Sequence, residues 1–389
     1  MFTDLPVWAY ISIIVILTQI TIASVTIFLH RTQAHRSVAL HPLMSHFFRY
    51  WLWLTTGIIT KEWVSVHRKH HAKVDSTEDP HSPQILGLKR VLTRGAELYR
   101  HESSKLETLE KYGHDTPDDW VERNLYTKYS YAGVWFMLII NCSLFGALGL
   151  TIWAVQMMWI PIFAAGVING LGHWWGYRNF EPEDASTNIF PLGFFIGGEE
   201  LHNNHHAFAS SAKFSNKWYE LDLGWCCIRA LQFAGFARVK KLAPSPVLDY
   251  QKNSIDAETI KAIISNRFYV MSHYASSVIK QVYREEKIKL KSTHLKITRS
   301  HKKLLIRQGS LLDDAAKARL NKLLSENEQL KTVYDFGLKL QSIWQNKHAS
   351  QESLMDSLRE WCNNAEKTGI KALEEFSQTV RAYRMQEVY

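Results

Sequence analysis

The feature that most constrains the fold is the distribution of charge along the chain. Residues 129–177 contain no Asp, Glu, Lys or Arg, and a second uncharged stretch of 23 residues runs from Val7 to Leu29. As a helix the second stretch reaches about 35 Å, more than the ~30 Å hydrocarbon core of a bilayer. The longer stretch provides two further crossings, near residues 131–154 and 156–172. The sequence therefore predicts an all-α integral membrane protein with about three transmembrane helices.

The Lys and Arg residues predict the orientation of these spans. They are absent before the first span and inside the hairpin turn, but abundant in residues 31–128 and after residue 178. Because basic loops remain in the cytoplasm, this pattern places the N-terminus outside and the C-terminus inside. The apolar stretch Leu43–Thr60 contains Arg49, so hydropathy alone leaves open whether it crosses the membrane.

Histidines gather in clusters beside the predicted spans. The clusters are His30-Arg-Thr-Gln-Ala-His35, His67-Arg-Lys-His70-His71, Asn169-Gly-Leu-Gly-His173 and His202-Asn-Asn-His205-His206. Residues three and four apart share one face of a helix, so each HxxHH cluster aims its imidazoles into one pocket. His30 and His35 are five apart and converge only at a helix end or where the helix is locally unwound.

Together these clusters supply nine imidazoles, enough for two metal ions with four or five nitrogens each. A single cluster could be a surface feature without metal, but three clusters beside spans on the same predicted side favour a metal centre. Imidazole suits iron, zinc, copper or nickel, so the ligand type alone does not choose the metal. A dry, membrane-embedded site for O₂ favours iron.

The motifs HxxxxH, HxxHH, NxxxH and HxxHH, in this order, resemble the membrane fatty-acid desaturases, specifically the bacterial relatives of acyl-CoA Δ9 desaturases. The resemblance covers roughly Leu29 to Lys241. It implies a cytoplasmic histidine-box domain with two iron ions, and no catalytic residues separate from the metal site. The implied ligands are His30, His35, His67, His70, His71, His173, His202, His205 and His206, with Asn169 bound through a water.

The implied reaction uses O₂ as co-substrate and introduces a cis double bond, at the Δ9 position, into a long-chain acyl-CoA or phospholipid acyl chain. A hydroxylase or monooxygenase of the same histidine-box superfamily is the alternative. The implied location is the inner (cytoplasmic) membrane, with the active site on the cytoplasmic side. Leu43–Thr60 then forms a peripheral or re-entrant helix, because a crossing would separate the first two clusters. Eukaryotic acyl-CoA desaturases have two spans before the first box, whereas one fits here.

Several residues near the clusters have two interpretations. Carboxylates that orient metal-bound imidazoles are expected among Asp75, Glu78, Asp79, Glu199 and Glu200, with solvated loop charges as the alternative. Trp63 either lines the acyl channel, as the resemblance implies, or anchors the chain at the membrane interface. Arg68 and Lys69 either steer an anionic head group or attract the membrane surface.

The electrons for the reaction must come from another protein. The chain has no GxGxxG motif after a strand, and no haem or cysteine iron–sulfur motif. The expected partners are therefore a ferredoxin- or flavin-type reductase, the lipid or acyl-CoA substrate and the membrane. The net charge of +9 does not indicate nucleic acid, because the basic residues form no patch interleaved with aromatic residues.

The last third of the chain differs in composition from the rest. We expect a desaturase domain over residues 1–245 and a soluble helical extension over residues 246–389. Ser310 with Asp313 is typical of a helix start. One helical face of this region carries Leu312, Leu320, Leu323, Leu330 and Tyr334. This face predicts the core of a helical bundle, with a partner-binding or dimerising role as the alternative. For the whole chain, a non-enzymatic alternative is a metal-binding membrane scaffold whose C-terminal helices recruit partners.

Overall fold

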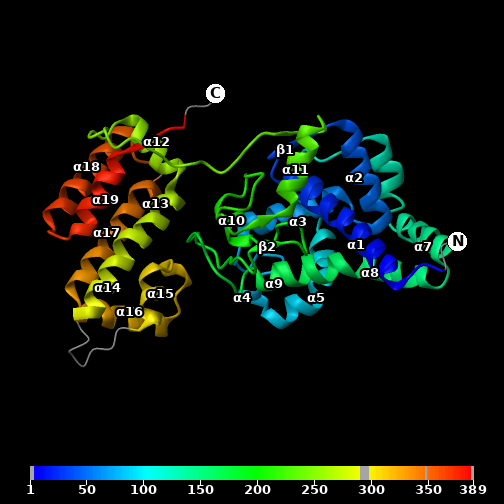
Figure 1. Cartoon of the computed structure of the whole chain (residues 1–389), viewed down its shortest axis with the longest axis horizontal. Helices are drawn as coiled ribbons and strands as arrows, with labels where there is room; N and C mark the ends of the chain where they lie inside the picture. Colours follow the sequence, from blue (N-terminus) through cyan, green and yellow to red (C-terminus); the bar gives the residue numbers. More distant parts are fainter. Residues whose placement is uncertain (1–3, 290–297, 347, 387–389) are drawn as a thin grey trace. The chain divides into compact units, whose positions relative to one another are not determined.

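The computed structural model describes residues 4–289, 298–346 and 348–386 (Figure 1). The chain divides into two compact units. Unit 1 consists of Met1–Arg178 and Asp184–Ala243, and unit 2 consists of Asn179–Glu183 and Pro244–Tyr389. The predicted domain boundary after residue 245 stays a prediction, and the five-residue segment Asn179–Glu183 from the middle of the chain belongs to unit 2.

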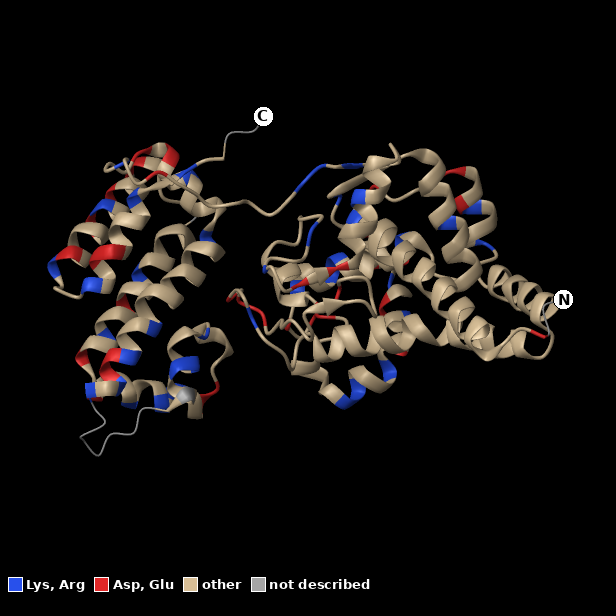
Figure 2. Ribbon diagram, viewed as in Figure 1, with Lys and Arg blue, Asp and Glu red and all other residues tan. Residues whose placement is uncertain are grey.

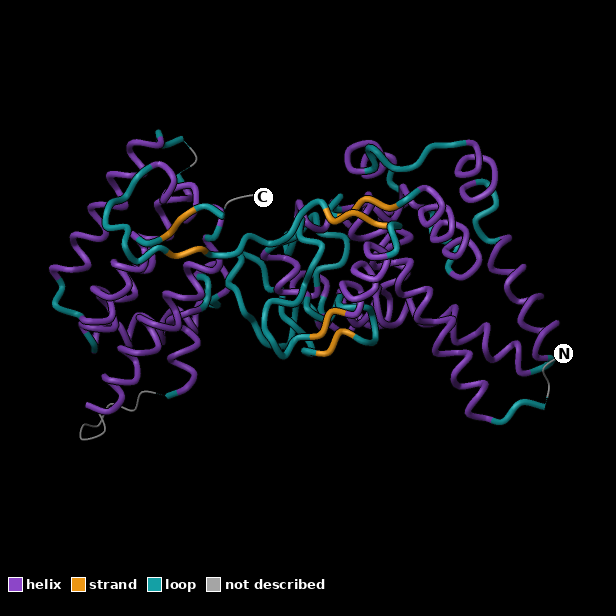
Figure 3. The backbone as a smooth tube through the Cα atoms, turned by 45° about the horizontal axis from the view of Figure 1, so that its top comes forward, coloured by secondary structure: helices purple, strands orange, loops and turns teal. Residues whose placement is uncertain are grey.

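Unit 1 is largely helical, and Figure 3 shows its short paired strands. Its helices are α1 (Val7–Ala23), η1 (Ser24–Ala34), α2 (Pro42–Thr55), α3 (Thr60–Lys73), α4 (Pro83–Leu86), α5 (Leu88–Ser103), α6 (Leu106–Tyr112), η2 (Glu122–Thr127), α7 (Ala132–Phe145), α8 (Leu148–Trp159), η3 (Ile160–Ile168), α9 (Asn169–Leu171), α10 (His202–Ala207) and α11 (Leu223–Phe233). Strand β1 (Val38–Leu40) pairs antiparallel with β4 (Ala237–Val239), and β2 (Leu192–Gly193) pairs parallel with β3 (Leu221–Asp222).

Two continuous helices are long and apolar enough to cross a membrane. Helices α1 and η1 form the first, Val7–Ala34, and α8, η3 and α9 form the second, Leu148–Leu171. Helix α7 is equally apolar but has only 14 residues. Figure 2 shows that these helices carry almost no charged residues. The described part of unit 1 therefore has two candidate spans by length and composition and one shorter apolar helix, and the predicted number of about three stays a prediction.

The predicted spans 131–154 and 156–172 are wrong at the turn between them. Helix α7 ends at Phe145, because Gly146 adopts a positive φ of 60° that glycine tolerates better than other residues. Helix α8 then continues through Gln156, which the sequence analysis had placed at the start of the second span. The amide of Gln156 is buried and accepts a hydrogen bond of 3.0 Å from Asn141 Nδ2, so it does not interrupt the helix.

The stretch Leu43–Thr60 does not form a candidate span. It contains α2 and ends where α3 begins, and α2 has 14 residues. Arg49 on α2 is buried and forms ion pairs with Asp119 at 2.6 Å and Glu122 at 2.8 Å. The histidine clusters on the two sides of α2 lie in one site, which agrees with a peripheral or re-entrant helix.

Unit 2 is a helical bundle around one apolar core. Its helices are α12 (Ala257–Ser265), α13 (Arg267–Tyr274), η4 (Ala275–Ile279), α14 (Lys280–Lys289), α15 (Arg299–Ile306), η6 (Gly309–Leu311), α16 (Asp314–Glu326), α17 (Glu328–Gln345), α18 (Gln351–Lys367) and α19 (Lys371–Arg381). Strands β5 (Val247–Leu248) and β6 (Tyr383–Arg384) pair antiparallel.

The core of unit 2 contains the face that the sequence analysis identified. Leu312, Leu320, Leu323 and Leu330 are buried in it, and Tyr334 packs against it, which confirms the predicted bundle core. The predicted helix start at Ser310 is wrong. Ser310 lies in η6, and Asp313 caps α16 by accepting a hydrogen bond of 2.7 Å from the backbone of Ala316. A carboxylate at the N-cap satisfies a backbone N–H that the helix leaves unpaired.

Candidate metal centre

The nine histidines of the sequence motifs gather in one site of unit 1. They come from the end of η1, from α3, from the residues after α9 and from α10. Their nitrogens form two groups that could each hold a metal ion. The first group is His30, His35, His67, His71 and His205, and the second is His70, His173, His202 and His206. The nine residues therefore divide into five and four.

Nitrogen atoms of imidazoles in the first group approach one another closely. The Nε2 atom of His205 lies 3.0 Å from that of His30 and 2.9 Å from that of His71. Two ligands at right angles on a metal with bonds of ~2.1 Å are about 3.0 Å apart. These separations therefore fit nitrogens that share one ion.

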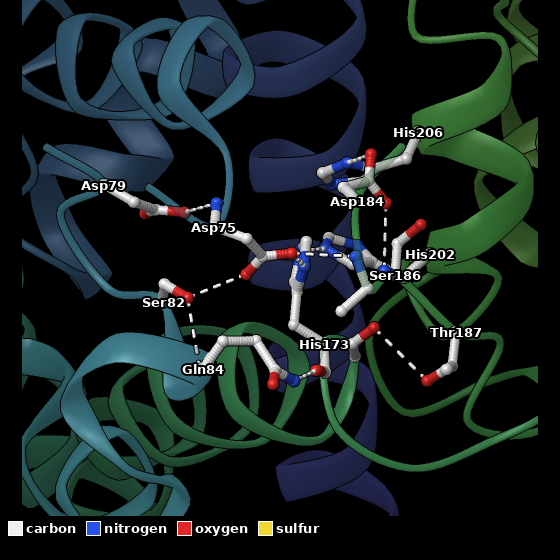
Figure 4. Close-up of polar contacts among 12 residues, drawn as sticks. Asp75, Asp79, Ser82, Gln84, His173, Asp184, Ser186, Thr187, His202 and His206 are labelled. Carbon is white, nitrogen blue, oxygen red and sulfur yellow. Dashed lines mark hydrogen bonds and ion pairs between the residues drawn. The ribbon is translucent and has the colours of Figure 1, made fainter. Parts of the chain in front are cut away.

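The second group has the same spacing and unpaired nitrogens. The Nε2 atoms of His173 and His202 are 3.0 Å apart (Figure 4). The buried Nε2 atoms of His70 and His206 have no hydrogen-bond partner within the described part of the chain. Because an unpaired buried polar atom is costly, these lone pairs fit a metal ligand.

A π-helix explains how His30 and His35 converge. The segment η1 is π-helical, and the backbone N–H of His35 donates to the carbonyl of His30 at 3.0 Å. In a π-helix residues five apart lie on one face, as residues four apart do in an α-helix. The two rings are 4.9 Å apart between centroids. The predicted local unwinding is therefore present.

Four carboxylates accept hydrogen bonds from the outer nitrogens of these histidines. Glu199 contacts His30 Nδ1 at 2.7 Å, and Asp79 contacts His70 Nδ1 at 3.0 Å. Figure 4 shows Asp75 beside His173 and Asp184 beside His206, each at 3.1 Å from the Nδ1 atom. Such contacts fix the ring and turn the Nε2 lone pair toward the metal.

Three of these carboxylates, Asp75, Asp79 and Glu199, were predicted from the sequence, whereas the fourth, Asp184, was not. Glu78 instead pairs with Lys73 at the surface, and Glu200 accepts backbone N–H groups of Ile196 and Gly198. Asp184 lies between the last two histidine motifs, and its position relative to their histidines matches no known ligand pattern. The sequence therefore does not indicate that it contacts the site.

Burial and mutual repulsion keep most of the imidazoles uncharged. Burial, followed by the charges of neighbouring groups, lowers the pKa of His35 to about 3. The same causes hold the pKa values of His67 and His71 well below the ordinary value. Burial also lowers the pKa of His70, but the charge and hydrogen bond of Asp79 outweigh it and raise the pKa. Neutral imidazoles are the form that binds metal ions.

A cavity of about 330 Å³ reaches the histidine site. Its walls come from α3, α5, η3 and the loop before α3, and include His67, Trp63 and Asn169. The ring of Trp63 stacks on His67 with centroids 4.9 Å apart and planes 11° apart. A mostly apolar cavity of this size is typical of a ligand pocket. The structure thus places Trp63 in the wall of the pocket.

Two cations between the histidines of α3 have internal partners. Arg68 donates to the carbonyls of Gln33, Ala34, Tyr112 and His114 at 2.7–3.1 Å. Lys69 pairs with Glu102 at 2.6 Å. These contacts hold the C-terminal end of η1, the end of α5 and the segment around α6 against α3, and they do not support the predicted steering of an anionic head group.

Comparisons with known proteins agree with this site. A family model for fatty acid desaturases matches residues 6–226. Delta-9 acyl-lipid desaturase 1 of Arabidopsis thaliana is 31% identical over 239 residues, which cover 60% of this chain and 76% of the relative. Delta-9 desaturase-like 3 protein of the same plant is 34% identical over 56% of this chain and 72% of the relative. Acyl-CoA C20 Delta5-desaturase of Anemone leveillei is 30% identical over 54% of this chain and 67% of the relative.

A second family model, for a transposase, matches residues 256–388. Among the described residues of that range, no three His, Cys, Asp or Glu side chains form a group that could hold a metal ion. The desaturase match covers more than half of the chain and contains all nine clustered histidines. The chain therefore belongs to the fatty acid desaturase family and is a fatty-acyl desaturase, an oxidoreductase of lipid metabolism.

Proposed function

We propose that this desaturase uses O₂ and two iron ions to introduce a cis double bond, at the Δ9 position, into a long-chain acyl-CoA or phospholipid acyl chain. The observation that carries the proposal is the division of the nine histidines into groups of five and four beside one pocket. The names of the relatives support the acyl substrate, and two of the three relatives described above are named as delta-9 enzymes.

Each group of histidines would hold one iron ion. The first ion would bind His30, His35, His67, His71 and His205, and the second would bind His70, His173, His202 and His206. Asn169 would contact the second ion through a water. The family implies iron, and neutral imidazole nitrogens fit it. The iron pair supplies the oxidising power that removes hydrogen from unactivated methylenes, which no side chain can do by acid–base chemistry.

The protein's own residues would orient the substrate and the metal ligands. Trp63 and His67 form the wall where the pocket meets the histidines, so the carbons opposite them would react. The apolar walls would exclude water from the site. The carboxylates of Asp75, Asp79 and Glu199 would hold the imidazoles in place.

The reaction requires a membrane location and an external electron donor. One –CH₂–CH₂– unit loses two hydrogens, and O₂ takes up these, two protons and two electrons to form two waters. The two electrons would come from a ferredoxin- or flavin-type reductase that docks on the cytoplasmic face. The distribution of Lys and Arg supports an inner-membrane protein with its active site and C-terminus in the cytoplasm.

The decisive experiment supplies purified protein with a reductase, O₂ and either stearoyl-CoA or stearoyl phospholipid. We expect a Δ9 alkene from one of the two substrates and about two irons per chain. The variant His70→Ala should lose the product, whereas His101→Ala, on the exposed face of α5, should retain it. Hydroxy acids without a new alkene would indicate the hydroxylase instead, and an iron content of one or zero would contradict the nine-ligand site.

A further inference from the structure

His81 is a buried histidine beside the candidate metal centre, in addition to the nine that form it. It lies between α3 and α4, is 5% exposed, and its backbone N–H donates to Asp79 Oδ1 at 3.0 Å. Its ring stacks on that of His70, with centroids 4.4 Å apart and planes 28° apart. Asp79 therefore contacts the ring of His70 and the backbone of His81, so one carboxylate holds both residues.

One nitrogen of His81 has no partner. Its Nε2 atom is buried and makes no hydrogen bond within the described part of the chain. Leaving such an atom unpaired costs roughly 1–3 kcal/mol, so a buried imidazole of this kind normally faces water or a ligand. A role in packing alone would be served equally well by a phenylalanine at this position.

The neighbours of His81 belong to the four-nitrogen group. Burial, followed by the nearby His70, lowers the pKa of His81 to about 3; Asp79 opposes this effect, and His173 and His206 contribute to it. His81 is nevertheless outside the set of four nitrogens that lie together, although it groups with His70 and Asp79. It is therefore close to this group but not placed as one of its direct ligands.

The pocket connects His81 with Asn169. Both residues line the cavity that reaches His67, so a small molecule that enters this cavity can contact either of them. The four-nitrogen group has one nitrogen fewer than the other group, which leaves room for a ligand that the protein does not supply.

We propose that His81 Nε2 hydrogen-bonds the small exogenous ligand, normally a solvent molecule, that completes the metal ion of the four-histidine group and that Asn169 would also contact. This inference rests on the proposed function, because it requires iron in that group. His81 is thus a positioning residue that acts on the non-protein ligand, in addition to the nine histidines and Asn169.

The variants separate hydrogen bonding from packing. His81→Phe retains a ring that stacks on His70 but removes both nitrogens. His81→Gln places an amide at about the reach of Nε2, whereas His81→Asn is too short and reaches only the position of Nδ1. If the Phe variant does not fold, the pair of Gln and Asn variants makes the same comparison. The control is His101→Phe, at an exposed position on α5.

Two quantities are measured: the iron content per chain, and the affinity of the oxidised, iron-loaded protein for azide. Azide binding is monitored through the absorption band of the azide complex. Azide is the probe for the exogenous ligand. We expect about two irons in every variant, and azide affinity reduced about tenfold or more in His81→Phe and His81→Asn. His81→Gln and the control should bind azide as the wild type does.

Three results would overturn the inference, and they differ from one another. Unchanged azide affinity in His81→Phe with two irons bound would show that His81 only packs on His70. A loss of one iron in that variant would make His81 a direct metal ligand. A wild-type chain that binds no iron would overturn the proposed function itself, and the inference with it.

Discussion

Arg31 and Asp222 form a fully buried bidentate ion pair across 191 residues of sequence, with N···O distances of 2.8 and 3.2 Å. Arg31 directly follows His30 of the metal site. Its guanidinium also donates to the carbonyls of Gly197 at 3.2 Å and Ala212 at 2.9 Å. The pair therefore ties the first histidine cluster to the segments that flank the third.

We expect Asp222→Asn to destabilise the protein strongly. The variant would leave the Arg31 charge buried without a counter-charge, at a cost of roughly 3–5 kcal/mol. Thermal unfolding of the detergent-solubilised protein would measure the change. The control is Asp118→Asn, which removes an exposed ion pair with Arg123 and should change the stability by less than about 1 kcal/mol. Equal stability of the two variants would refute a role for the buried pair.

The contact between Asp79 and His70 predicts an effect on metal affinity. Asp79→Asn should weaken iron binding about 10–100-fold, because the amide orients His70 less well and makes it a poorer ligand. Competition with a chelator would measure the affinity. Glu78→Gln is the matched control, since Glu78 is exposed and pairs with Lys73 only. If both variants release iron equally readily, the contact with His70 does not support the site.

The packing of α5 on η3 predicts a steric effect at Gly95. A Cβ atom at this position would lie 2.1 Å from the carbonyl oxygen of Ala165, so the two helices would have to separate. Gly95→Ala should therefore cost about 1–3 kcal/mol of stability and lower the desaturation rate, because both helices line the pocket. Glu97→Ala on the exposed face of α5 should leave both unchanged. Retention of full stability and rate by Gly95→Ala would contradict the close packing.

Glu102 predicts a dependence of stability on pH. Burial raises its pKa, but hydrogen bonds from Lys105, Lys69 and Thr108 outweigh this and lower the pKa from 4.5 to about 2. A lowered pKa in the folded state stabilises the fold above about pH 4.5, and this contribution disappears as the pH falls toward 2. Glu102→Gln should therefore be less stable than the wild type at pH 7, with a difference that shrinks below pH 4.5. A difference that does not vary with pH would exclude this linkage.

The burial of Phe180 predicts that truncating its side chain, which would leave a cavity, destabilises unit 2. This residue of the segment Asn179–Glu183 is 1% exposed and packs edge-on against Tyr269 with centroids 5.1 Å apart. Phe180→Ala should destabilise unit 2 by about 3–5 kcal/mol. Limited proteolysis of unit 2 would detect the change. Tyr250→Ala, at an exposed position of the same unit, should be cleaved no faster than the wild type. Equal cleavage of the two variants would contradict the contribution of buried Phe180 to the stability of unit 2.

Much of the metal site follows from local spacing that the sequence shows directly. Residues three and four apart share a helix face, so any helix through His67, His70 and His71 directs them to one side. Asp75 and Asp79 follow this helix within two turns, which made them candidates as carboxylate partners. The bundle core of unit 2 was visible for the same reason, because its leucines repeat with the period of a helix.

The sequence by itself determined the class of the protein: long uncharged stretches that suit a membrane, and nine histidines at motif spacing. The tertiary structure decided which histidines share a metal. His70 and His71 are adjacent but point about 100° apart around α3, so packing against the other clusters assigns them to different groups. It also brought in Asp184 and His81, because contacts between distant residues leave no periodic pattern in the sequence. The turn between α7 and α8 lies at Gly146, whose positive φ the apolar pattern does not reveal.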